Sequence, residues 1–316
     1  MKKFAVIFPG QGAQYIGMGK GLFEHKFAVE VMKKANDILG FDLKKLCLEG
    51  PLELLTQTDN SQVALYTCGY IAYRLLMEQL PTGCTPVVTA GLSLGEFTAL
   101  AAAEVYSFED GLRLVRKRGT LMQQACIDNP GTMASIMGAE RDAVDVWVEE
   151  AKQKKHIIAT ANLNCPGQVV ISGTVEGVAF VAECAEKNGF KAVPLNVSGA
   201  FHSPLMESAR KGLAEAITLI DFSDPILPVF SNCDAILKSH AQEIKKALVD
   251  QMVNSVLWQS IIEQISAMDV SLFIELGCGK VLKGLLRRID RSAECISVEA
   301  VEDISNLTSV LFQKVS

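Results

Sequence analysis

The sequence lacks the patterns of a membrane-spanning segment, a signal peptide and a cysteine-containing metal site. No stretch of about 18 apolar residues occurs, so we expect no membrane span. The apolar run at residues 4–8 is too short for a signal peptide, so we expect no targeting segment. None of the nine cysteines forms a C-x-x-C pair or lies near a histidine at ligand spacing. We therefore expect no metal site and a reduced, cytoplasmic protein.

A net positive charge and a complete phosphate-binding loop are also missing. A net charge of −6 argues against nucleic acid as the main partner. The glycine-rich loop at residues 9–14 starts the dinucleotide pattern G-x-G-x-x-G but breaks at Tyr15, and Gly19-Lys20 is followed by Gly21 instead of the serine or threonine of a P-loop. This loop is expected either to supply a backbone N–H to a neighbouring site, as loops after parallel strands do, or to be a tight turn.

The most informative stretch is residues 87–103, where a β-prone run passes into a helical pattern through one serine between two glycines. Gly91 and Gly95 lack Cβ atoms, so strand and helix can close around a strained turn that exposes the Ser93 hydroxyl. The backbone N–H of Leu94 then lies at the helix start, where it can donate to a developing oxyanion. The pattern predicts a nucleophilic serine; the alternative is a glycine-rich turn with a helix-capping serine.

One arginine stands on the apolar side of the helix predicted at residues 107–125. Arg118 lies roughly opposite the centre of the polar arc that contains Arg113 and Lys117. A buried charge without a partner is costly, so Arg118 requires an anion. An internal carboxylate and a substrate carboxylate both satisfy that requirement, and the sequence leaves the two open.

The remaining pattern of 316 residues, 49% of them hydrophobic, predicts two domains. Alternating strands and helices around Ser93 indicate an α/β-hydrolase-like core with a mainly parallel sheet, assigned to residues 1–127 and 198–316. Residues 132–195 instead read strand, helix, strand, strand, helix, strand, which predicts an inserted ferredoxin-like domain at 128–197. Further elements are expected as helices at 19–39 and 61–80, a helix ending at Ala267, and strands at 228–231 and 271–275.

His202 is the histidine that sits in a constrained loop between apolar elements, whereas His25, His156 and His240 lie on polar stretches. It can be a structural residue or the base of a nucleophile. A hydrolase triad would want an acid between the core strands and His202, yet most acids there belong to the inserted unit. Spacing alone therefore predicts a Ser-His pair whose imidazole is oriented by a group other than a carboxylate.

Six sequence blocks together resemble the malonyl-CoA:acyl carrier protein transacylases. They are P-G-Q-G-A-Q at 9–14, G-L-S-L-G-E at 91–96, R-G at 118–119, N-x-N-x-P-G-Q at 162–168, G-A-F-H-S at 199–203, and Gln251 followed by N-S-V-L-W. The blocks stand in the family's order and span nearly the whole chain. The resemblance adds Asn162, through its block, to the substrate-binding residues.

The resemblance also implies a role for each of these positions. It implies Ser93 as nucleophile, His202 as base, Arg118 as anchor for the malonyl carboxylate, the backbone N–H groups of Gln11 and Leu94 as the oxyanion hole, and a main-chain carbonyl near Gln251 that orients His202. Malonyl-CoA is then a substrate and no separate cofactor is needed. The implied partner is acyl carrier protein, and we expect a monomer.

The sequence departs from the family at one position, because Leu92 stands where members usually carry histidine before the serine. No role of that histidine is carried over to this chain. Phe201 resembles the malonyl-selective form of its block, in which a bulky ring crowds the space of an α-methyl group. The alternatives are a trans-acting acyltransferase of polyketide synthesis, a serine thioesterase or esterase, and a non-catalytic scaffold that binds acyl carriers.

Docking of an acidic carrier protein on an acidic enzyme requires a local basic patch. Lys280, Lys283 and Arg287 share one face of a predicted helix, with Arg288 alongside. Lys187 and Lys191 of the inserted unit offer further positive charge. The helix face is predicted either as the docking patch or as an ordinary solvated surface.

Overall fold

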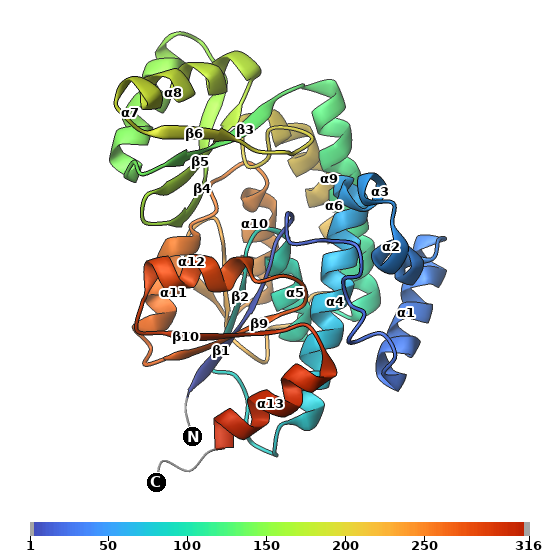
Figure 1. The fold of residues 1–316 in the computed structure, drawn as a ribbon. Helices are drawn as coiled ribbons and strands as arrows, with labels where there is room; N and C mark the ends of the chain where they lie inside the picture. Colours follow the sequence, from blue (N-terminus) through green and yellow to red (C-terminus); the bar gives the residue numbers. More distant parts are fainter. Residues whose placement is uncertain (1–2, 313–316) are drawn as a thin grey trace.

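The computed structural model describes residues 3–312, which form two β-sheets with helices around them (Figure 1). The larger sheet has the strand order β10-β9-β1-β2-β7-β8, with all neighbours parallel except β7 and β8. Its strands are β1 (Phe4–Phe8), β2 (Val88–Gly91), β7 (Val229–Phe230), β8 (Leu237–Lys238), β9 (Leu272–Leu276) and β10 (Glu294–Val298). The expected mainly parallel sheet is confirmed.

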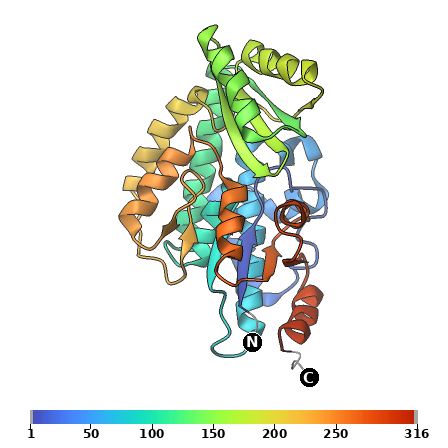
Figure 2. The same cartoon turned by 90° about the vertical axis from the view of Figure 1, so that its left-hand side faces the viewer.

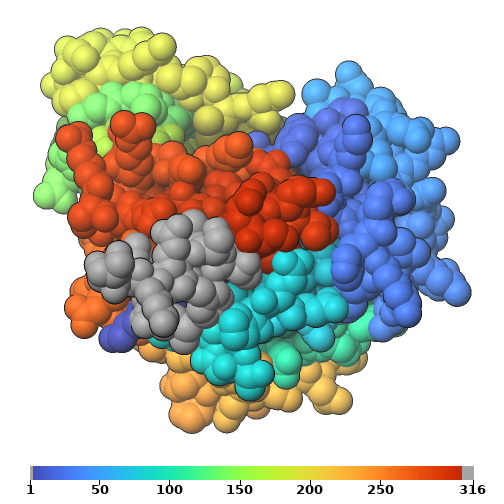
Figure 3. Space-filling view, turned by 60° about the horizontal axis from the view of Figure 1, so that its bottom comes forward, coloured from blue at the N-terminus to red at the C-terminus, as the bar shows by residue number. Residues whose placement is uncertain are grey.

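Both faces of the larger sheet are buried, as a parallel sheet between helices requires. Alternate side chains of β1 enter different cores: Phe4, Val6 and Phe8 join one hydrophobic cluster, whereas Ala5 and Ile7 join the other. The helices are α1 (Lys26–Leu39), α2 (Leu43–Glu49), α3 (Leu52–Thr56), α4 (Thr58–Gln79), α5 (Leu94–Ala102), α6 (Phe108–Asp128), α9 (Glu207–Thr218), α10 (Ala241–Gln251), α11 (Trp258–Ser266), α12 (Val281–Ile289) and α13 (Val301–Phe312). A short 3-10 helix, Pro204–Met206, precedes α9. α13 packs against α4 at the end of the molecule that faces the viewer in Figure 3.

The second sheet is antiparallel, with the order β4-β5-β3-β6, and lies at one end of the molecule (Figure 2). Its chain order is β3 (Thr132–Met137), α7 (Arg141–Gln153), β4 (Ile158–Cys165), β5 (Gln168–Gly173), α8 (Val175–Lys187) and β6 (Lys191–Pro194). This is the predicted succession of strands and helices. A separate hydrophobic cluster, which includes Trp147, Ile171 and Val181, joins these two helices to the sheet.

Two helix predictions were wrong at their boundaries. The helix expected at 19–39 begins only at Lys26, because Gly17 and Gly19 adopt positive φ in a run of turns. The single helix expected up to Ala267 is broken into α10 and α11. Between them Val256 pairs with β4, donating its N–H to the Ala161 carbonyl and accepting from the Leu163 N–H. These bonds replace helical hydrogen bonds and join the segment between α10 and α11 to the smaller sheet.

No helix within residues 3–312 combines the length and apolar character needed to cross a membrane. The same part of the chain contains no group of three or more His, Cys, Asp or Glu side chains placed to hold a metal ion.

Candidate active site

Ser93 occupies a strained turn between β2 and α5. Its φ of 53° and ψ of −103° lie outside the regions that L-residues favour. The turn is tight enough that a Cβ on Gly91 would come within 1.9 Å of the Gly95 carbonyl carbon, and a Cβ on Gly95 within 2.1 Å of the Phe8 carbonyl oxygen. Glycine is required at both positions because strand, turn and helix pack without room for a side chain.

Asn232, just after β7, holds this turn through both ends of its side-chain amide. Its Oδ1 accepts from the Ser93 N–H at 2.6 Å, and its Nδ2 donates to the Gly91 carbonyl at 2.8 Å. The side chain is fully buried. Asn232 was missed by the sequence reasoning, because the turn it pins lies 139 residues away in the chain and no local motif marks it.

The Ser93 hydroxyl and the His202 ring lie in hydrogen-bond contact, with 2.8 Å between Oγ and Nε2. The other ring nitrogen, Nδ1, is 2.9 Å from the Gln251 backbone carbonyl. A carbonyl only accepts, so Nδ1 carries the proton and Nε2 is free to accept from Ser93. Burial, helped by the nearby Arg118 charge, lowers the pKa of His202 to about 4. The imidazole is therefore neutral at pH 7 and can act as a base.

The Arg118 side chain, on α6, also contacts the Ser93 hydroxyl and is 1% exposed. Its Nη2 donates to Ser93 Oγ at 3.1 Å and to Gln251 Oε1 at 2.9 Å, while Nη1 donates to Gln62 Oε1 at 2.7 Å. All three acceptors are neutral, and no ion pair between Arg118 and a carboxylate is found within residues 3–312. Within the same residues, Arg118 Nε has no hydrogen-bond partner. The sequence left two anions open as partners of Arg118, and among the described residues no internal carboxylate contacts it.

Behind these groups lies a second layer of buried polar side chains. Gln251 Nε2 donates to the Ser93 carbonyl at 3.0 Å and to Glu96 Oε2 at 2.7 Å. Glu96 Oε2 also accepts from the Asn232 backbone N–H at 3.1 Å. Burial raises the pKa of Glu96 to about 7, whereas burial lowers the pKa of Arg118 to about 10 and Glu96 opposes that shift. Glu96 belongs to a sequence block singled out above, but its place behind Arg118 could not be read from the sequence.

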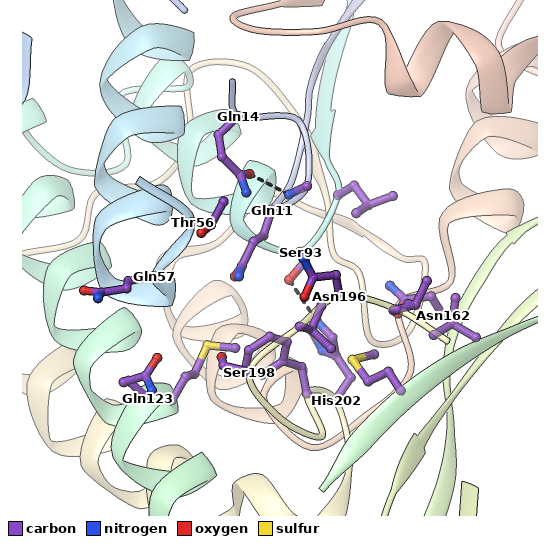
Figure 4. A pocket seen from close by; sticks show the side chains of 18 of the residues that line it. Gln11, Gln14, Thr56, Gln57, Ser93, Gln123, Asn162, Asn196, Ser198 and His202 are labelled. Carbon is purple, nitrogen blue, oxygen red and sulfur yellow. Dashed lines mark hydrogen bonds between the residues drawn. The ribbon is translucent and has the colours of Figure 1, made fainter. Parts of the chain in front are cut away.

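Ser93 and His202 face a cavity of about 660 Å³ between the two sheets (Figure 4). Of the predicted site residues, Gln11, Ser93, Arg118, Asn162, Phe201 and His202 line it. Gln251 is buried behind the wall, and the N–H of Leu94 lies at the first residue of α5, where helices leave N–H groups without an intrahelical partner. Asn162 comes from the smaller sheet and Gln11 from the loop after β1. The cavity is therefore shared by the two parts of the fold.

Leu92 also lines the cavity, beside Ser93. The position that usually carries histidine in the resembled family thus presents an apolar side chain to the site.

The predicted basic patch lies outside the cavity, on and beside α12. Arg288 of this helix donates to the Gln168 side chain and the Pro166 carbonyl at the tip of the smaller sheet. Lys280, directly before α12, is exposed, as are Lys283 and Arg287 on the helix.

The acyl transferase domain model matches residues 5–310. The malonyl CoA-acyl carrier protein transacylase of Bacillus subtilis is 42% identical over 96% of each chain, and that of Haemophilus influenzae is 38% identical over 98% of this chain and 100% of the relative.

Solved structures agree with these matches. The transacylase structure from Coxiella burnetii matches with a TM-score of 0.95 at 35% identity, covering 99% of this chain and 98% of that one. A malonyl-transacylase in complex with a type II polyketide synthase acyl-carrier protein matches with a TM-score of 0.93 at 35% identity, covering 98% of this chain and 100% of that one. The resemblance seen in the sequence is confirmed: this chain belongs to the acyl transferase domain family.

Proposed function

We propose that this protein transfers the malonyl group from malonyl-CoA to the pantetheine thiol of acyl carrier protein, through a malonyl ester of Ser93. The observation that carries the proposal is a buried guanidinium that donates to the nucleophile itself, 3.1 Å from Ser93 Oγ, and has no carboxylate partner in the described chain. A malonyl thioester supplies both missing parts: a carbonyl for Ser93 and a carboxylate for Arg118.

In the first half-reaction, Nε2 of neutral His202 takes the Ser93 proton while Oγ attacks the thioester carbonyl. The backbone N–H groups of Leu94 and Gln11 donate to the oxyanion of the tetrahedral intermediate. Collapse of the intermediate breaks the C–S bond, and the His202 imidazolium returns its proton to the coenzyme A thiolate. The Gln251 carbonyl keeps Nδ1 protonated throughout and stabilises the imidazolium.

The second half-reaction reverses these steps with a different thiol. The pantetheine thiol of the carrier protein gives its proton to His202, and its sulfur attacks the malonyl-serine carbonyl. The C–O bond to Ser93 breaks and His202 reprotonates Oγ. Both halves balance with the groups of this chain and its two substrates, so we propose no cofactor and no metal.

Acyl selectivity is assigned to two side chains in the cavity wall. Arg118 selects malonyl over neutral acyl groups because a charge-assisted pair forms only with the free carboxylate. Phe201, 6% exposed, narrows the space next to the malonyl methylene, which disfavours an α-methyl group. Exclusion of one methyl group is worth only about 1–3 kcal/mol, so Phe201 gives a preference.

We also propose the finer description of the fold: an α/β-hydrolase-like catalytic domain at residues 1–127 and 198–316 with a ferredoxin-like domain inserted at 128–197. The sheet order β4-β5-β3-β6 supports the second part. A cytoplasmic monomer is the proposed state, with the exposed face of Lys280, Lys283 and Arg287 as the docking patch for an acidic carrier protein.

The competing function is hydrolysis of the same acyl-serine by water, as in a thioesterase. To separate the two, the protein is incubated with malonyl-CoA and pantetheine-bearing acyl carrier protein, and malonyl-carrier product and free malonate are measured together. We expect product to exceed malonate at least tenfold, and no product from Ser93→Ala. Malonate as the main product would overturn the transferase proposal, as would undiminished transfer by Ser93→Ala.

A further inference from the structure

Glu96 is a buried carboxylate for which the reaction above has no use. It lies in the first turn of α5, three residues after the nucleophile, and is 2% exposed. Burying a carboxylate is unfavourable unless its oxygens receive hydrogen bonds. Here Oε2 receives two, from the Gln251 side chain at 2.7 Å and from the Asn232 backbone at 3.1 Å.

The bond to Gln251 settles which way that amide points. The two ends of a glutamine amide have the same shape but opposite hydrogen-bonding character. Arg118 only donates and an ionised Glu96 only accepts, so the arrangement with Oε1 on Arg118 and Nε2 on Glu96 satisfies both neighbours. The reversed amide would set donor against donor and acceptor against acceptor.

Charge leads to the same pair. Arg118 is surrounded by neutral acceptors, and Glu96 is the acidic group whose field stabilises the guanidinium. The charge of Glu96 reaches Arg118 across the Gln251 amide, without direct contact that would occupy the guanidinium. Arg118 thus stays charged and held in place while its contact with a ligand carboxylate remains open.

We propose that Glu96 is a positioning residue, which through the side-chain amide of Gln251 holds the Arg118 guanidinium in the orientation that receives the malonyl carboxylate. This inference rests on the proposed function and deepens it. Loss of the Glu96 charge weakens the binding of the malonyl carboxylate by Arg118 more than it slows the attack of Ser93. The preference for malonyl-CoA over acetyl-CoA is therefore the quantity that should change most.

The ionisation of Glu96 makes the inference testable by pH. The titratable or charged groups that act on it are Arg118 on α6, Tyr106 before that helix, and Cys233 and Asp234 after β7. With a pKa of about 7, Glu96 is ionised above neutrality and gains a proton below it. His202, whose pKa is about 4, does not titrate in this range, and the malonyl carboxylate stays ionised.

The experiment measures kcat/KM for malonyl-CoA and acetyl-CoA in the full-length protein from about pH 5.5 to about pH 8.5. Acetyl-CoA is the internal reference, because it shares the coenzyme A moiety and the Ser93 chemistry but has no free carboxylate. Glu96→Gln keeps the shape and an acceptor but removes the charge. Glu275→Gln is the matched control, since Glu275 is 1% exposed and accepts from the N–H groups of Leu282 and Lys283.

In the wild type we expect the malonyl-to-acetyl ratio to fall about tenfold as the pH drops through 7. Glu96→Gln should show the low ratio at every pH, while Glu275→Gln should keep the wild-type profile. In a Gln251→Ala background, Glu96→Gln should change the ratio less than about twofold, because the connecting amide is gone.

Three outcomes would overturn the inference. A Glu96→Gln variant with the wild-type ratio and pH profile would do so, as would an equally large effect of that change in the Gln251→Ala background. If Glu96→Gln does not fold, a wild-type ratio that stays constant with pH overturns it. In each of these cases the wild type transfers malonyl groups and the proposed function stands; a wild type without malonyl transfer would overturn the proposed function and this inference together.

Discussion

Replacing Arg118 with alanine tests how the acyl group is selected. The malonyl carboxylate would lose a bidentate pair, and each hydrogen bond to a charged group contributes about 1.5–3 kcal/mol. Two such bonds amount to at least about 3 kcal/mol, and about 1.4 kcal/mol corresponds to a tenfold change. We therefore expect the preference for malonyl-CoA over acetyl-CoA to fall at least about a hundredfold.

The assay is a competition in which equal amounts of malonyl-CoA and acetyl-CoA acylate the enzyme and the two adducts are resolved by mass spectrometry. Arg118 also donates to Ser93 Oγ, so absolute rates should fall for both substrates, and only the ratio isolates the carboxylate contact. Arg116→Ala is the matched control, because that side chain pairs with Asp59 at 2.9 Å outside the site. A wild-type malonyl preference in Arg118→Ala would refute the assignment of Arg118 as anchor.

Three further predictions address the base, the turn and the docking patch. With acetyl-CoA, the rate of single-turnover acylation should stay constant from about pH 8 to about pH 5.5 and fall only near pH 4, because the lowered pKa of His202 keeps this proton acceptor neutral until then. A fall in rate centred near pH 6.5, the usual pKa of histidine, would contradict this prediction. Asn232→Ala should lower the free energy of unfolding by about 2–4 kcal/mol, because it leaves the Ser93 N–H and the Gly91 carbonyl unpaired, and should slow acylation by both acyl-CoAs equally. Denaturant titration measures the first effect and the competition assay the second; unchanged stability would contradict the role of Asn232. Charge reversal at Lys283 and Arg287 should raise the KM for acyl carrier protein and leave that for malonyl-CoA unchanged, whereas unchanged values for both would discard the patch.

Much of the site could be predicted because its signals are local. The strand, serine and helix at residues 87–103 are contiguous, and the glycines beside Ser93 have a direct steric reason. The succession of strands and helices that forms the smaller sheet also follows from periodicity within each segment. Local patterns of this kind survive folding because the tertiary structure reinforces them.

The partners of these residues could not be predicted, because they come from distant parts of the chain. Arg118 was expected to need an anion, yet it contacts Gln62 and Gln251, which lie 56 and 133 residues away. No periodicity indicates that two neutral amides hold a buried guanidinium. The break between α10 and α11 was missed for the same reason, since it depends on pairing with β4.

The central claim is that Ser93 carries the malonyl group after His202 has removed its proton. The most direct test is peptide-mapping mass spectrometry of the protein quenched shortly after mixing with malonyl-CoA, for the wild type and for His202→Ala. We expect a malonyl adduct on Ser93 in the wild type, which disappears when acyl carrier protein is added, and at least a hundredfold slower labelling of His202→Ala. An adduct on another residue, no adduct at all, or wild-type labelling of His202→Ala would contradict the account.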